Sequence, residues 1–68
     1  MAFQVEVEQE VDNRWIAEIG ELPGALAYGA SRQEAIDRVQ ALALRVVADR
    51  LDHGETIPQL NGLFAVAS

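Results

Sequence analysis

The chain has 68 residues, with eleven acidic against five basic side chains, a formal net charge of −6 and no cysteine. This length predicts one domain over residues 1–68, and the missing thiols exclude disulfides and cysteine-based metal centres. The acidic balance excludes the basic stripe that a nucleic-acid surface needs. We expect a cytoplasmic protein, because no apolar stretch reaches the roughly 20 residues of a membrane-spanning helix and the acidic, alternating N-terminus is unlike a signal peptide.

The negative charge is unevenly distributed along the chain. Residues 1–30 carry six acids against Arg14 alone, a balance of −5, whereas the remaining residues come to −1. An acidic surface favours a basic protein partner, since opposite potentials speed encounter and fix register. The alternative is that the charge only keeps a small domain soluble.

The first 19 residues predict a β-hairpin. In "FQVEVEQEV", apolar Phe3, Val5 and Val7 alternate with polar and acidic side chains, the period of a half-buried strand with a solvated acidic face. "DNR" at 12–14 has turn composition, and "WIAEI" at 15–19 alternates again. Two such runs around a short polar loop form a hairpin.

The stretch "GELPGALAYGASRQEA" at 20–35 predicts a turn, a strand and a helix start. Pro23 and Gly24 suit the two central positions of a type II turn. "ALAY" at 25–28 is a short third strand ended by Gly29. Ser31 and Glu34 have the spacing of a capping box, in which each side chain binds a free backbone N–H at the start of a helix.

A helix is predicted from about residue 32 to 53, with Gly54 as the residue that ends it. At 100° per residue one arc packs on the sheet, and it contains Ala35, Ile36, Val39, Leu42, Ala43, Val46 and Val47. A second apolar sector contains Ala41, Leu44, Ala48 and Leu51. Three or four short strands cannot cover both sectors, so we predict a homo-oligomer, a dimer or tetramer, with Leu44, Ala48 and Leu51 at its interface.

After a connection with turn chemistry at Pro58 and at Asn61-Gly62, "LFAVA" at 63–67 predicts a last strand that returns to the sheet edge. The predicted order is therefore β-β-β-α-β. The fold class is α+β, an antiparallel sheet with one long helix packed on one face.

No pattern in the sequence predicts catalysis, a cofactor or a metal site. His53 sits in the predicted last helical turn, where a cation suits the helix dipole. Glu6, Glu8 and Glu10, with Glu18 across the hairpin, are interpreted as a solvated strand face; the alternative is a divalent-metal nuclease. Gly29 to Ser31 lack a phosphate-binding fingerprint. The two largest aromatic side chains are interpreted as core or interface residues rather than base-stacking platforms.

Taken in order, the motifs resemble the HicB-like antitoxin domain of HicA–HicB toxin–antitoxin pairs. The likeness runs over about residues 3 to 67, and its elements are Trp15-Ile16-Ala17-Glu18-Ile19, Leu22-Pro23-Gly24, Tyr28-Gly29, Ser31, Glu34-Ala35, Gly54-Glu55 and Ile57-Pro58. The resemblance implies a partial RNase H-like fold, oligomers, and neutralisation of a small basic HicA-type RNase. The sequence departs from the family at Ala25, often Cys there, and around Arg38-Val39, and it shows no C-terminal DNA-binding segment. We therefore expect no direct DNA binding.

The leading hypothesis is a non-catalytic protein-binding module of the HicB antitoxin type. Glu6, Glu8, Glu10 and Glu18 are the expected electrostatic contacts, and Trp15 and Tyr28 are the expected interface anchors. The alternative is an orphan self-associating structural module with no toxin partner.

Overall fold

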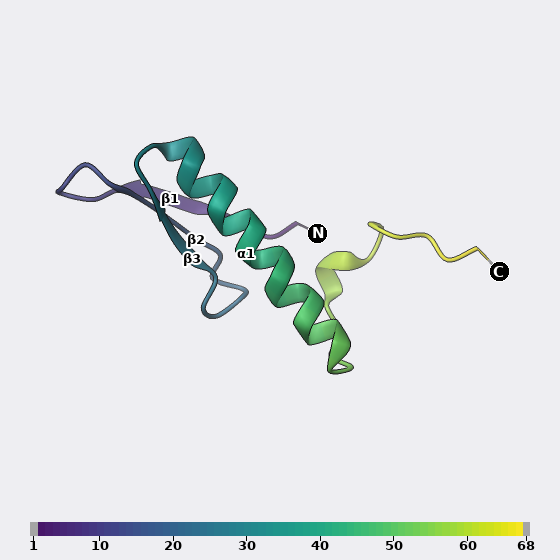
Figure 1. Cartoon of the computed structure of the whole chain (residues 1–68). Coiled ribbons are helices and arrows are strands. Elements are labelled where there is room, and N and C mark those ends of the chain that lie inside the picture. Colours follow the sequence, from purple (N-terminus) through teal and green to yellow (C-terminus); the bar gives the residue numbers. More distant parts are fainter. Residues whose placement is uncertain (1, 68) are drawn as a thin grey trace.

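The structure, a computed structural model, describes residues 2–67 and consists of three antiparallel strands followed by one long helix. The strands are β1 (Glu6–Gln9), β2 (Trp15–Glu18) and β3 (Leu26–Gly29), and the sheet order is β1-β2-β3. Helix α1 (Arg32–Asp52) lies across one face of this sheet, and a 3₁₀ turn, η1 (Pro58–Leu60), follows it (Figure 1). The α+β class and the predicted order up to the helix are confirmed.

The hairpin between β1 and β2 closes through a turn centred on Asn13. This residue has φ of 69°, a left-handed conformation that Asn tolerates better than most residues. Its backbone N–H donates to the Glu10 carbonyl at 3.0 Å, and the Glu10 N–H donates to the Arg14 carbonyl at 2.7 Å. Asp12 completes the turn, because its carboxylate accepts from the Arg14 backbone N–H at 3.2 Å and from Arg14 Nε at 2.7 Å.

The acid stability of the hairpin is expected to depend on Asp12. The hydrogen bond from the Arg14 backbone N–H, with help from the Arg14 guanidinium, lowers the pKa of Asp12 below its ordinary value of 3.8. A depressed pKa in the folded state adds stability that is fully present above the unfolded-state value and is lost as the pH falls through the folded-state value. NMR titration of the carboxyl carbon should give a pKa below 3.8. Replacing Asp12 with Asn should remove this part of the acid dependence, and an unshifted titration would contradict the assignment.

Local chemistry sets the turn and the helix start as the sequence predicts. Gly24 has φ of 92°, and the Ala25 N–H donates to the Leu22 carbonyl at 2.9 Å, which closes the Pro23-Gly24 turn. At the helix start, the Glu34 N–H donates to Ser31 Oγ at 3.1 Å. The return bond differs from the capping-box prediction, because the Glu34 carboxylate accepts from the N–H of Ala30 rather than of Ser31, at 3.0 Å.

The helix ends in the motif expected for a glycine after the cap. Gly54 has φ of 79°, and its N–H donates to the Leu51 carbonyl at 3.0 Å. The Glu55 N–H reaches back to the Arg50 carbonyl, also at 3.0 Å. These two bonds form a Schellman motif, which satisfies carbonyls that the last turn leaves free. No helix within residues 2–67 is long and apolar enough to cross a membrane.

The core between the sheet and α1 is small. Helix α1 contributes one buried residue per turn, namely Ala35, Val39, Ala43 and Val47. The other buried residues come from β2, from the loop after it and from the residue before η1, namely Ala17, Ile19, Leu22, Ala25 and Ile57. Leu22 and Val39 are the largest fully buried side chains. Alanines at the helix–sheet contact allow close approach but bury little apolar area, so few large side chains stabilise the fold.

Helix α1 is longer than the sheet that it covers. Its 21 residues span about 31 Å at 1.5 Å each, whereas a four-residue strand spans about 13 Å. The second half of α1 therefore continues past the sheet (Figure 1). Ile57 is buried there, and Leu60 of η1 also packs against the core.

The predicted last strand is wrong. Residues 63–67 lie outside the three-stranded sheet and are exposed, and Figure 1 shows them running away from the end of η1. The physical reason lies in the connection. Gly62 has φ of 88°, and a turn closed by an isolated bridge between Asn61 and Phe64 directs the segment away from the sheet.

Candidate functional site

The candidate site is the face of the sheet opposite α1, called here the outer face. In the β1–β2 register Glu6 lies opposite Glu18 and Glu8 lies opposite Ile16, and β3 adds two residues to the same face. Because side chains alternate along a strand, one face collects every second residue. The outer face consists of Glu6, Glu8, Ile16, Glu18, Leu26 and Tyr28.

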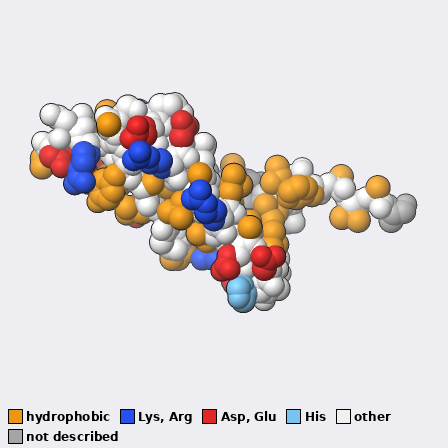
Figure 2. Space-filling view, viewed as in Figure 1, with side chains coloured by type: hydrophobic (Ala, Val, Ile, Leu, Met, Phe, Trp, Pro, Cys, Tyr) orange, Lys and Arg blue, Asp and Glu red, His pale blue; other side chains and the backbone are white. Residues whose placement is uncertain are grey.

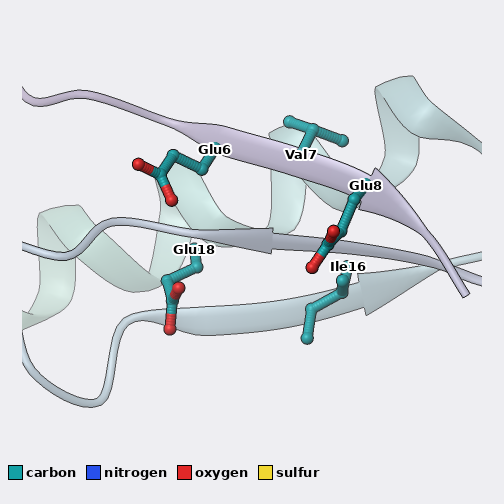
Figure 3. Close-up of a pocket in the computed structure, with 5 residues that line it drawn as sticks. All are labelled: Glu6, Val7, Glu8, Ile16 and Glu18. Atoms are coloured by element: carbon teal, nitrogen blue, oxygen red, sulfur yellow. The ribbon is translucent and has the colours of Figure 1, made fainter.

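Three carboxylates of the outer face border a shallow depression. Its volume is about 150 Å³, and Glu6, Glu8, Ile16 and Glu18 line it with Val7 (Figure 3). In Figure 3 the carboxylates project from the side of the sheet that faces away from the helix, and Ile16 lies beside Glu8. An apolar floor with carboxylates around it can receive the stem and the charged head of a Lys or Arg side chain.

Among the described residues, the carboxylates of the outer face form no ion pair. The ion pairs among residues 2–67 are Asp12–Arg14 and Glu34–Arg38, and Asp49 lies near His53; none of these contacts involves the three carboxylates. Like charges on directly opposite residues destabilise a sheet, and Glu6 and Glu18 are such a pair. Local conflicts of this kind are typical of functional surfaces.

Tyr28 gives the outer face an aromatic and cationic side. Tyr28 is 40% exposed. The Arg14 guanidinium carbon lies 4.8 Å from the ring centroid, a cation–π distance. Arg38 links α1 to β3, because its Nη1 donates to the Tyr28 carbonyl at 3.0 Å. With Leu26 and Ile16 nearby, the ring makes an apolar centre beside the acidic patch, a composition common in protein interfaces.

The structure separates two residues that the sequence groups with this face. Trp15 lies opposite Gly29 on the helix side of the sheet and packs against the core, whereas Tyr28 is on the outer face. Glu10 follows the end of β1 and belongs to the hairpin connection. Ile16 and Leu26 belong to the outer face and were not predicted as site residues. The register of the hairpin could have found Ile16, because Ile16 and Glu18 have the same parity, whereas Leu26 required the register between β2 and β3.

The other polar candidates have structural roles. His53 is the C-cap residue of α1 and is exposed, and its Nδ1 lies 2.7 Å from the Asp49 carbonyl oxygen. Because a carbonyl oxygen only accepts, Nδ1 carries the proton in this contact. Within residues 2–67 no group of three or more His, Asp or Glu side chains is placed to hold a metal ion.

A second surface lies on the other side of the molecule. It is an apolar groove of about 460 Å³ between the segment before β1, the middle of α1 and η1. Its lining includes Phe3, Val5, Leu44, Val47 and Leu60, and none of the described residues that line it carries a charge. Hydrophobic side chains gather over η1 and the segment beyond it in Figure 2.

The three residues predicted for the oligomer interface are exposed and lie in one row of α1, since their spacing is i, i+4 and i+7. Leu44 is 70% exposed and lines the groove. Ala48 and Leu51 continue the row beyond the groove. The row and the groove therefore overlap at Leu44 alone.

No protein-family model, curated protein or solved structure matches this chain. The likeness to HicB-like domains rests on the ordered residues named above. The function is therefore inferred from the surfaces of the molecule.

Proposed function

We propose that this chain is a non-catalytic protein-binding module whose outer face docks on a small basic protein, as a HicB-type antitoxin would cover a HicA-type RNase. The observation that carries the proposal is the set of three carboxylates without cation partners among the described residues, placed around an apolar floor. A basic partner would supply the missing counter-charges and relieve the repulsion between Glu6 and Glu18. Covering a basic RNA-cleaving surface with carboxylates would block RNA, which also binds by charge.

The carboxylates are expected to control affinity and its salt dependence together. The variant Glu6→Gln, Glu8→Gln, Glu18→Gln should weaken binding to the basic partner by about tenfold or more at low salt, since exposed interfacial charges contribute roughly 0.2–1 kcal/mol each and act through steering as well. The loss should shrink at high salt, where screening already weakens the wild-type contact. Titration calorimetry at several salt concentrations measures both effects.

A charge-matched variant controls for net charge. Asp49→Asn, Asp52→Asn, Glu55→Gln also removes three of the acids that give the chain its charge of −6, but these residues lie at the far end of α1. This variant should bind as the wild type does. Equal weakening of both variants would assign the effect to overall charge and contradict an outer-face site.

A second candidate function is self-association as a structural module. The observation that favours it is the uncharged groove with the exposed row of Leu44, Ala48 and Leu51. Such apolar surface on a small domain marks an interaction site. The two functions use opposite sides of the molecule, so one chain can have both.

A further inference from the structure

We infer that the residues after Leu63, 64–67, of one copy occupy the apolar groove of a second copy, and that the exchange is reciprocal. The inference rests on the self-association proposed above and names the segment that makes the contact. It does not depend on the outer face, which lies on the opposite side of the sheet from α1.

The groove and the segment are complementary in chemistry. Phe64 and Val66 are 72% and 92% exposed, and they alternate, so that in an extended segment both point to one side. The groove offers uncharged walls from Phe3, Leu44 and Leu60. Burial of such exposed apolar side chains against a partner favours association, because it removes them from water.

The groove and the segment are the surfaces through which two negatively charged copies can meet without repulsion. Each copy has a net charge of −6, so most approaches bring like charges together. The groove lining is uncharged, and residues 56–67 contain no Asp, Glu, Lys, Arg or His. Docking of this segment therefore brings no like charges into contact.

The path of the segment also suits an exchange between copies. Leu63 lines the groove of its own chain, and the residues after it run outward (Figure 1). Each segment thus begins at one groove and extends away from that chain, the arrangement needed to reach a second copy.

The groove also lies beside a free sheet edge. The strand order places β1 at the edge, and Phe3 and Val5, which precede it, line the groove. An extended segment from a second copy can pair with such an edge. The apolar residues after Leu63 would then form backbone hydrogen bonds with a strand edge of the second copy.

The test is the mass of the full chain in solution over a range of concentrations, by light scattering and sedimentation equilibrium. The wild type should be a dimer or a higher even-numbered oligomer. Phe64→Glu and Leu44→Glu, each at an exposed position, should raise the dissociation constant by at least about 100-fold, because each buries a charge in an apolar contact. Val11→Glu, at a fully exposed residue of the hairpin connection, adds the same charge and should leave the dimer unchanged.

Mixing the variants distinguishes exchange from other interfaces. Chains with Leu44→Glu keep an intact segment, and chains with Phe64→Glu keep an intact groove. In an equimolar mixture the heterodimer therefore has one intact contact of its two, whereas either homodimer has none, so the heterodimer should form at lower concentrations than both homodimers. A monomeric wild type, including one whose segment folds back on its own groove, would overturn the inference. So would a dimer that Leu51→Glu abolishes and Phe64→Glu does not affect. The second result would leave self-association through the helix row standing.

Discussion

Replacing Leu22 with Ala is expected to lower the free energy of unfolding by about 2–5 kcal/mol. Leu22 is 1% exposed and, with Val39, is one of the two largest fully buried side chains. The loss combines the transfer free energy of the deleted atoms with the cavity that they leave. Four of the nine buried apolar residues are Ala, so few side chains can move to fill that cavity.

The effect is large relative to the whole fold. At roughly 0.05–0.15 kcal/mol per residue, a chain of 68 residues has a total stability of about 3–10 kcal/mol. Leu22→Ala should therefore remove a large share of the total stability, and urea titration monitored by circular dichroism should show a lower midpoint of unfolding. Leu26→Ala deletes the same atoms at an exposed position and should cost less than about 1 kcal/mol. Equal losses for the two variants would contradict the described core.

Replacing Gly29 with Ala should destabilise the fold by about 1–3 kcal/mol, the usual range for overpacking. A Cβ atom at this position would lie 2.5 Å from the backbone N of Ala35 and 3.0 Å from its Cα. Backbone atoms cannot rotate aside as a side chain can, so β3 and the start of α1 would have to separate. The Ser31 cap and the hydrogen bond from Arg38 to the Tyr28 carbonyl lie in the same region.

Gly20 offers the matched control. A Cβ atom there meets nothing within 4 Å among the described residues. Gly20→Ala should be neutral or stabilise by roughly 0.4–1 kcal/mol, because it restricts the unfolded chain. Thermal unfolding of both variants measures the contrast. A Gly29→Ala variant as stable as Gly20→Ala would mean that the helix start does not lie against β3.

Much of the fold could be predicted because its local chemistry acts within a few residues. The Pro23-Gly24 turn, the Ser31 cap and the Gly54 helix end each depend on one side chain or one backbone conformation. The buried row of α1 follows from helical periodicity in the same way. The first two strands are shorter than predicted, and β1 begins only at Glu6 although the alternation starts at Phe3.

Features that depend on tertiary arrangement could not be predicted. Residues 63–67 have the composition of a strand, but only the path through η1 decides whether they reach the sheet. The groove joins the segment before β1 to α1 and η1, which are far apart in the sequence. The opposite placement of Trp15 and Tyr28 required the register between β2 and β3, whereas the grouping of Glu6, Glu8 and Glu18 needed only the hairpin.

The most direct test of the proposed function is capture of partners from the cells that make this protein. Tagged wild type, the outer-face variant with three Glu→Gln changes and its charge-matched control would be used side by side, with quantitative mass spectrometry of what co-purifies. The account predicts a small basic protein that the wild type and the control retain, that the outer-face variant loses, and that salt releases. Recovery of the chain itself alone, or of the same proteins by all three baits, would contradict it.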